Sequence, residues 1–254
     1  MRPRRLVFGE QAELYDRARP SYPAELIDDL VALVGRTAHV LDAAAGTGKA
    51  TVMLAERGLH GVAVEADAAM ARVARRNLAP HPCWRVDESD FEEWQPREDD
   101  GVFDLVTVGQ AWHWIDRERG TRQAECLLRP GGWLAIFGYD YEFVDSALRR
   151  AIDAIYDELD PSPTARALAP PERIAPGHAF GDPIVGEYRG DRAYATAEWI
   201  ALQRTQSNVR ILDPEIREEL LRRLAEAIDD HGGVHREHYV CRLWAASRSG
   251  GATA

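Results

Sequence analysis

The sequence predicts an α/β fold: a mostly parallel seven-stranded sheet with helices on both faces. From residue 36 to residue 140, short apolar runs alternate with helix-like segments. This alternation implies parallel pairing through right-handed crossovers. The runs are apolar on both faces, as a sheet covered on both sides requires. We also expect a helical segment ahead of this core and helical additions before the last strand.

Five strands of the core are set off by turn and cap residues. Gly58 is placed to end a helix over 50–57, and Asp67 and Asp116 are placed to cap the helices that follow them. A turn is expected at Arg129–Gly132 because it contains proline followed by two glycines. The predicted strands are 39–41, 62–65, 83–86, 103–108 and 133–137.

The pattern changes after residue 140. Apolar residues recur at helical spacing over 143–159, and proline and glycine over 160–185 predict a loop. The remaining elements are expected to be a strand at 187–195, helices at 197–212 and 214–229, and a last strand at 238–245.

The charge balance argues against nucleic acid as a partner. The formal net charge is −11, from 31 Lys and Arg against 42 Asp and Glu, so phosphate backbones would be repelled. No stretch approaches the roughly 20 apolar residues of a membrane helix, and no apolar signal core follows the basic start at Met1–Arg5. We therefore expect a cytoplasmic protein that binds neither nucleic acid nor membrane.

Cysteine spacing predicts no metal site and no disulfide framework. The three cysteines, Cys83, Cys126 and Cys241, are scattered, and none belongs to a CxxC pair. We expect them to be small buried side chains in a reducing compartment.

The segment 43–51 is similar to two nucleotide-binding loops but fits neither. A phosphate-binding loop needs GxxxxGK followed by Ser or Thr, and here Ala43 and Ala50 occupy the first glycine and the hydroxyl position. A dinucleotide loop needs GxGxxG, and its third glycine is replaced by Thr51. Nucleotide hydrolysis and dinucleotide binding are thus both disfavoured.

Another ligand fits the same loop and the strand beside it. Asp42 ends the first strand and can accept hydrogen bonds from an ammonium group, and Gly46 and Gly48 allow a ligand to approach the backbone. Glu65 ends the next strand, where an acid accepts hydrogen bonds from ribose hydroxyls. Ligands in such sheets bind at the carboxyl ends of strands. The implied ligand has a ribose and needs no pyrophosphate cradle, as is true of S-adenosylmethionine.

These residues resemble the class I S-adenosylmethionine-dependent methyltransferases, specifically their type 11 branch. The resemblance spans roughly residues 5–140 and includes the turn Leu128–Gly132. Tyr15–Pro23 and Gln110–Asp116 are similar to segments of a subgroup that includes trans-aconitate methyltransferase-like proteins, and the tail 197–233 more loosely resembles actinobacterial members. The resemblance implies a Rossmann-like sheet and S-adenosylmethionine as cofactor.

The resemblance also implies which residues contact the cofactor. Asp42 and the loop line its methionine and ribose parts, Glu65 binds the ribose hydroxyls, and Asp90 and Phe91 contact the adenine. The full predicted set is Tyr15, Arg19, Asp42, Ala44, Gly46, Thr47, Gly48, Glu65, Ala66, Asp90, Phe91, Gly109 and Gln110.

Several of these residues have a plain structural alternative. Asp42 can merely cap the glycine turn, Glu65 can be a solvated strand end, and Phe91 can be core. Asp87 and Glu88 are rivals of Asp90 for the adenine. Arg19 is the candidate for holding the methionine carboxylate or an acidic acceptor, because its planar fork suits carboxylates, or else it is a surface arginine.

His113 is the candidate general base, since its ordinary pKa lies near working pH. A carboxylate acceptor would need no base, and His113 would then shape the pocket instead. Trp112, Trp114, Tyr139 and Tyr141 are the candidates for contact with the acceptor, although the tryptophans can equally pack under the next helix.

We therefore expect one methyltransferase domain over 1–254. It comprises a segment covering the cofactor at 1–35, a cofactor-binding core at 36–140 and C-terminal helices and strands at 141–254. Its predicted reaction is methyl transfer to a small molecule, a carboxylate or a hydroxyl. The alternatives are a protein that binds S-adenosylmethionine or S-adenosylhomocysteine without catalysis and, less favoured, a nicotinamide-dependent oxidoreductase.

Overall fold

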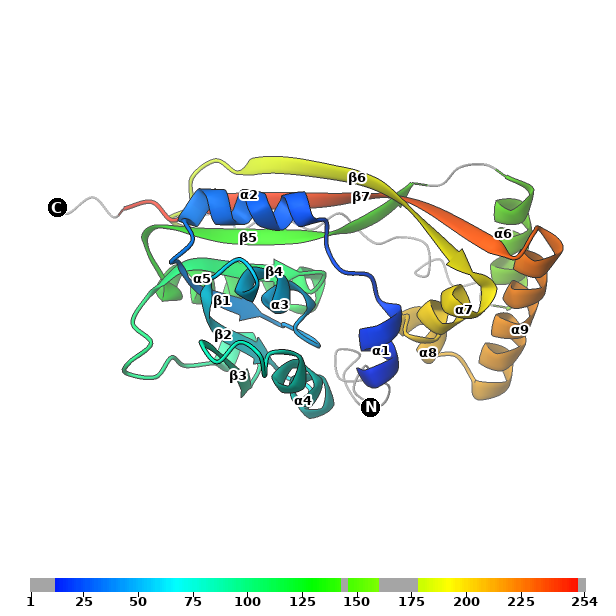
Figure 1. The fold of residues 1–254 in the computed structure, drawn as a ribbon, viewed down its shortest axis with the longest axis horizontal. Coiled ribbons are helices and arrows are strands. Elements are labelled where there is room, and N and C mark those ends of the chain that lie inside the picture. Colours follow the sequence, from blue (N-terminus) through cyan, green and yellow to red (C-terminus); the bar gives the residue numbers. More distant parts are fainter. Residues whose placement is uncertain (1–11, 143–145, 160–177, 251–254) are drawn as a thin grey trace. The chain divides into compact units, whose positions relative to one another are not determined.

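The fold is built on one seven-stranded sheet (Figure 1). A computed structural model describes residues 12–142, 146–159 and 178–250. The strand order is β3-β2-β1-β4-β5-β7-β6. The strands are β1 (His39–Ala43), β2 (His60–Glu65), β3 (Trp84–Glu88), β4 (Phe103–Gly109), β5 (Leu128–Glu142), β6 (Ile184–Ala195) and β7 (Val234–Ser247).

The first five strands pair in parallel, as the alternation of strands and helices requires. In the centre of the sheet Leu41 lies opposite Val62 on one side and Val106 on the other. β7 runs back between β5 and β6, antiparallel to both (Figure 1). The predicted α/β fold with a mostly parallel sheet is confirmed.

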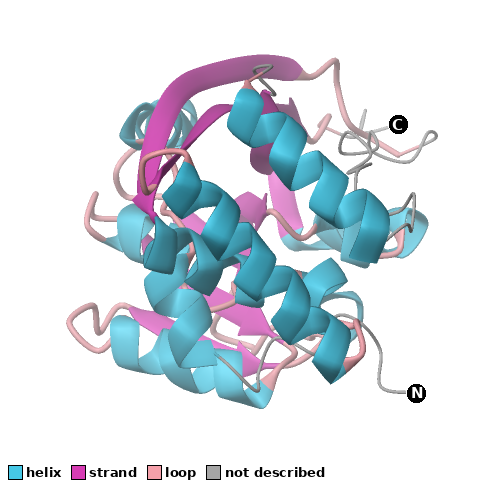
Figure 2. Ribbon diagram, turned by 90° about the vertical axis from the view of Figure 1, so that its right-hand side faces the viewer, coloured by secondary structure: helices cyan, strands magenta, loops and turns pink. Residues whose placement is uncertain are grey.

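Helices connect the strands, as Figure 2 shows by colour. Asp67 accepts hydrogen bonds from the amides of Ala69 and Met70, and Asp116 accepts one from the amide of Arg119, so both predicted caps are present. The helices are α1 (Ala12–Ala18), α2 (Ala24–Val34), α3 (Lys49–Ala55), α4 (Ala68–Asn77), α5 (Arg117–Leu127), α6 (Ala147–Leu159), α7 (Thr196–Arg204), α8 (Ser207–Arg210) and α9 (Pro214–Asp230), with short 3-10 turns η3 (Phe91–Glu93) and η4 (Trp112–Trp114).

The contacts divide the chain into two compact units. One, here called the sheet unit, comprises 21–139, 171–188 and 241–254; the other, the helical unit, comprises 1–20, 140–170 and 189–240. The division falls inside β5, β6 and β7. The single domain expected over 1–254 stays a prediction.

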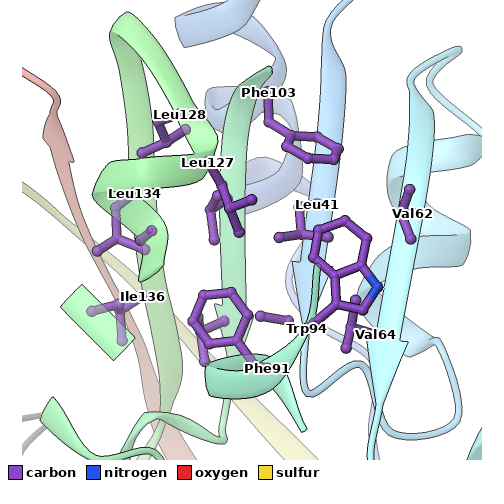
Figure 3. Close-up of a cluster of buried hydrophobic side chains, with 14 of the residues drawn as sticks. Leu41, Val62, Val64, Phe91, Trp94, Phe103, Leu127, Leu128, Leu134 and Ile136 are labelled. Carbon is purple, nitrogen blue, oxygen red and sulfur yellow. The ribbon is translucent and has the colours of Figure 1, made fainter. Parts of the chain in front are cut away.

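Each unit has its own apolar core. In the sheet unit, Leu41, Val64, Phe103 and Leu134 pack against Phe91 and other buried side chains of one sheet face (Figure 3). In the helical unit the core comes mainly from α6, α7 and α9, and its buried members are Ile152, Ile155, Trp199, Leu202, Val209, Leu220, Leu221, Leu224 and Ile228.

The structure corrects several local predictions. The helix expected over 197–212 is two helices, because the Thr205 hydroxyl donates to the Leu202 carbonyl at 2.7 Å and the chain turns there. The turn at Arg129–Gly132 lies inside β5 as an irregularity in the pairing with β4. The expected loop gives way to β6 at Ile184, and its residues 160–177 lie outside the described part of the chain.

Two further differences concern starts and burial. β7 begins at Val234, four residues earlier than expected. The helix expected from residue 143 is α6, which begins at Ala147, and residues 143–145 lie outside the described ranges. Cys83 and Cys126 are exposed, so the expectation of three buried cysteines was wrong for these two, and Cys241 is buried. Among the residues described, no helix is long and apolar enough to cross a membrane.

Candidate functional site

The loop after β1 is strained and is fastened to the end of β2. Ala44 has φ 52°, an uncommon value for a residue with a side chain, and Gly46 and Gly48 have φ 61° and 81°. The Ala45 amide donates to the Val64 carbonyl at 3.0 Å. Strained backbone that neighbouring structure holds in place is typical of ligand-binding loops.

Glu65 is the side chain that holds this loop. One carboxylate oxygen, Oε2, accepts the Gly46 amide at 2.8 Å, and the other, Oε1, accepts the Asp67 amide at 2.8 Å. The residue is only 9% exposed, and burial raises the pKa of its carboxyl group. The Ala66 amide is a third backbone donor to this carboxylate. A carboxylate has about four acceptor positions, so Glu65 keeps acceptor capacity after these contacts and can still receive a ribose hydroxyl.

Asp42 is engaged inside the sheet unit. Its carboxylate accepts the Thr51 hydroxyl of α3 at 2.5 Å and the Thr107 hydroxyl of β4 at 2.8 Å, and the residue is 1% exposed. Burial raises its pKa to about 6, against the lowering effect of both hydroxyls. Asp42 thus ties β1 to α3 and to β4. No pattern in the sequence singles out Thr51 and Thr107 as its partners.

Thr47 supplies a polar atom without a partner in the loop. Its hydroxyl is buried and makes no hydrogen bond among the described residues, while its carbonyl accepts the Asn77 side chain at 3.0 Å. Buried hydroxyls in proteins are nearly always paired. An unpaired hydroxyl beside Glu65 and Gly46 fits a loop that hydrogen-bonds a polar ligand.

The structure distinguishes the three acidic residues near the end of β3 that could contact the adenine. The carboxylate of Asp87 binds Arg85 at 3.1 Å and accepts the Trp94 indole N–H at 3.1 Å. Glu88 is exposed and lies 4.0 Å from Arg75. Asp90 is half-buried and precedes η3, so it stays the predicted adenine contact. Phe91 packs in the core of the sheet unit (Figure 3).

The carboxyl end of β4 is crowded by the segment that leads into α2. A Cβ atom on Gly109 would lie 2.6 Å from the Tyr22 hydroxyl and 2.9 Å from the Phe137 ring, so a side chain there would displace Tyr22. Tyr22 stacks on Tyr139 at 5.7 Å between ring centroids. Gln110 follows with φ 56°, a second strained position. At this end of β4 the backbone of Gly109 therefore packs directly against Tyr22 and Phe137, and Gln110 follows in a strained conformation.

The residues of η4 differ in environment. Trp112 is buried in the core of the sheet unit, and Gly120 of α5 makes room for its ring. Trp114 is partly buried against the same core. His113 lies in the more exposed middle position, 4.6 Å from the Trp114 ring, and partial desolvation lowers its pKa. Trp112 therefore packs beneath the next helix, as the alternative to an acceptor contact predicted. Contact of Trp112 and Trp114 with an acceptor stays a prediction.

Tyr15 of α1 and Arg19, just after that helix, lie in the helical unit. Arg19 donates to Thr205 Oγ1 at 2.9 Å and to Gln206 Oε1 at 2.9 Å, and its guanidinium lies over the Tyr15 ring. These contacts fix Arg19 at the break between α7 and α8. Binding of a carboxylate by Arg19, and cofactor contact by Tyr15, stay predictions.

Tyr139 and Tyr141 lie two residues apart on β5 but belong to different units. Tyr139 is buried, and its hydroxyl donates to the Ser21 carbonyl. Burial and the nearby Glu237 carboxylate raise the pKa of Tyr141 well above its usual range. Tyr141 therefore stays protonated near neutral pH. Their contact with an acceptor stays a prediction.

Comparison with known proteins assigns the loop and strands just described. Residues 40–132 match a family model described as a methyltransferase domain. An uncharacterised methyltransferase of Mycobacterium tuberculosis is 44% identical over 131 residues, which are 52% of this chain and 51% of that protein. Residues 40–132 thus match a methyltransferase domain. The predicted resemblance to methyltransferases is confirmed for this segment.

The predicted subgroup has weaker support than the methyltransferase domain itself. Trans-aconitate 2-methyltransferase of Deinococcus radiodurans is 32% identical over 111 residues, 42% of this chain and 41% of that enzyme. A solved structure described as a candidate type II methyltransferase of Anaeromyxobacter dehalogenans aligns over 91% of this chain and 98% of its own, with a TM-score of 0.64 and 24% identity, which shows the shared fold. The chain spans about half the length of the Mycobacterium relative and less of the Deinococcus enzyme.

His113 permits a prediction about the methyltransferase domain. Among the described residues no carbonyl or carboxylate accepts a hydrogen bond from its ring, so nothing holds it in the orientation that a general base needs. We expect His113→Ala to lower turnover by less than about tenfold, against the roughly 10²–10⁴-fold loss of an obligatory base. The check is turnover of both proteins from pH 5.5 to 9. A fall of activity on acidification through the histidine pKa that is absent from His113→Ala would make His113 the base.

Proposed function

We propose that this protein transfers the methyl group of S-adenosylmethionine to a small-molecule acceptor. The observation that carries the proposal is the geometry of Glu65, which holds the glycine loop at Gly46 and its own strand end at Asp67 and keeps acceptor capacity for a ligand hydroxyl. A ribose presents two neighbouring hydroxyls that such a carboxylate can receive. The strained loop and the unpaired Thr47 hydroxyl beside it support the same ligand.

The cofactor supplies a methyl group already activated by a sulfonium, so the protein's task is to align the acceptor and exclude water. Methyl transfer depends on an in-line approach at roughly 3–3.5 Å. In this proposal Glu65 binds the ribose, Gly46 and Gly48 let the ligand approach the backbone, and Asp90 contacts the adenine. Tyr22 packs against Phe137 and Tyr139 of β5, next to the end of β4.

From the sequence, we propose that the acceptor is a carboxylate or a hydroxyl compound. We propose a cytoplasmic location and no nucleic-acid partner, in keeping with the net charge of −11. The alternatives are a protein that binds the cofactor or its product without turnover, and a nicotinamide-dependent oxidoreductase. The second is disfavoured because Thr51, where a dinucleotide loop has its third glycine, gives its hydroxyl to Asp42.

Calorimetry tests the cofactor assignment directly. We expect S-adenosylmethionine and S-adenosylhomocysteine to bind and NAD and ATP to give no heat, because the loop offers a ribose acceptor without a pyrophosphate cradle. Incubation with methyl-labelled S-adenosylmethionine and a metabolite library then separates an enzyme from a binding protein. Heat from NAD with none from S-adenosylhomocysteine would refute the proposal.

A further inference from the structure

The glycine loop, residues 44–48, packs on one face of α4 within the sheet unit. A Cβ atom on Gly46 would lie 3.7 Å from the terminal carbon of Met70. A Cβ atom on Gly48 would lie 3.5 Å from the Cβ of Ala74. Met70 and Ala74 are four residues apart, so they lie on the same face of the helix, and both are buried. The shape of the loop therefore depends on α4 as well as on the strands that flank it.

The last residue of α4, Asn77, bonds the same loop. Its side-chain nitrogen Nδ2 donates to the Thr47 carbonyl at 3.0 Å. A carbonyl can only accept, so the amide must present its nitrogen there. The other end of the amide agrees, because Oδ1 lies 3.4 Å from two guanidinium nitrogens of Arg76, which can only donate. Both contacts therefore require the same orientation of the Asn77 side chain.

Glu65 and Asn77 hold neighbouring residues of the loop through opposite kinds of group. Glu65 accepts the Gly46 amide at 2.8 Å, and Asn77 donates to the carbonyl of the next residue, Thr47. The other Glu65 oxygen accepts the amide of Asp67, whose side chain caps the first turn of α4. The helix is thus joined to Glu65 at its start and to the loop at its end.

The backbone of the loop is strained and depends on such support. Ala44 has a φ of 52°, which is uncommon for a residue with a side chain. A strained conformation persists only where the surrounding structure holds it. A loop already held in its binding shape also loses less conformational freedom when a ligand binds, and this raises the affinity. Thr47 is 1% exposed, so the bond from Asn77 fixes a buried part of the loop.

We propose that Asn77 is a positioning residue for cofactor binding. It acts through the Thr47 carbonyl and keeps the glycine loop in the shape that binds S-adenosylmethionine. This inference rests on the proposed function and adds α4 to the elements that shape its site. What the position requires is a hydrogen-bond donor, and a side chain of the right size alone does not replace it.

The test separates the hydrogen bond from packing by two substitutions. Asn77→Leu has nearly the shape of asparagine without a donor, whereas Asn77→Gln keeps the amide and adds one methylene. We expect Asn77→Leu to weaken S-adenosylhomocysteine binding about three- to tenfold, the effect of one neutral hydrogen bond, and Asn77→Gln to stay within about twofold of wild type. Leucine is a better helix former than asparagine, so α4 itself should not be weakened. Calorimetry measures each affinity.

The matched control is Asn208→Leu. Asn208 is the only other asparagine in the sequence and is half-buried, as Asn77 is, but it lies on α8 in the helical unit. Its replacement should leave the affinity for S-adenosylhomocysteine unchanged. A packing role would give the opposite order at position 77, since leucine fits the space of asparagine better than glutamine does.

A second measurement shows whether Asn77 acts through the loop that Glu65 holds. In a Glu65→Ala background the loop has already lost its bond at Gly46, so Asn77→Leu should cost less than about twofold there. A full three- to tenfold loss in that background, or Asn77→Leu binding as tightly as Asn77→Gln, would overturn the inference and leave the cofactor assignment intact. A wild-type protein that does not bind S-adenosylhomocysteine would instead refute the proposed function, and this inference with it.

Discussion

Replacing Glu65 with alanine is expected to weaken S-adenosylhomocysteine binding by about 1.5–3 kcal/mol, or about 10-fold to 150-fold, the range for hydrogen bonds to a charged group. The loss has two sources. The ribose loses its carboxylate acceptor, and the loop loses the bond that fixes the Gly46 amide at 2.8 Å. Calorimetry with the purified variant measures the change.

The matched control is Glu88→Ala on the neighbouring strand. Glu88 lies opposite Glu65 in the β2–β3 register, but its side chain is 47% exposed and its nearest cation is 4.0 Å away. Its removal should change the affinity less than about twofold, since exposed ion pairs contribute little. The free energy of unfolding of Glu65→Ala should fall by about 1–3 kcal/mol, because two backbone amides lose their acceptor. An unaltered affinity in a folded Glu65→Ala protein would end the cofactor assignment.

Asp42 is expected to make the stability of the sheet unit depend on pH between about 4 and 6. Burial raises its pKa from 3.8 to about 6, so the folded state takes up the proton more readily than the unfolded chain does. Its contribution is therefore fully present below pH 4 and is lost as the pH rises through 6. A shift of this size corresponds to about 3 kcal/mol.

The measurement is the difference in free energy of unfolding between wild type and Asp42→Asn, taken by urea denaturation from pH 4 to pH 7.5. The asparagine imitates the protonated acid, so the free energy of unfolding of the variant should rise relative to that of the wild type as the pH rises. Asp100→Asn provides a control of opposite sign: Arg85 beside Asp100 lowers that pKa, so its stabilisation is present at neutral pH and lost on acidification. A wild-type minus Asp42→Asn difference that stays constant with pH would show that Asp42 titrates normally.

The local sequence was sufficient to predict the strands and helix caps of the core. The caps at Asp67 and Asp116 are formed by side chains bonding amides two or three residues away, so no distant contact is needed to specify them. The strands of the core could be predicted because a covered parallel sheet requires apolar residues on both faces. The break between α7 and α8 was not predicted: the Thr205–Leu202 hydrogen bond at the break is local, but Thr205 also accepts a bond from Arg19, 186 residues away in the sequence, which no local pattern shows.

For the candidate site, the sequence alone determined that a glycine loop and an acid stand at the ends of neighbouring strands, because the carboxyl ends of parallel strands share one edge. Only the tertiary structure decided what those side chains bind. Asp42 and Glu65 look alike in the sequence, but one binds two threonine hydroxyls inside the sheet unit and the other binds two backbone amides and keeps acceptor positions for a ligand. Pairing of the last strands brings Tyr141, Tyr194 and Glu237 together from segments up to 96 residues apart in the sequence. The physical reason is that strand periodicity is encoded locally, whereas the partner of a buried polar atom is set by which strands and helices pack together.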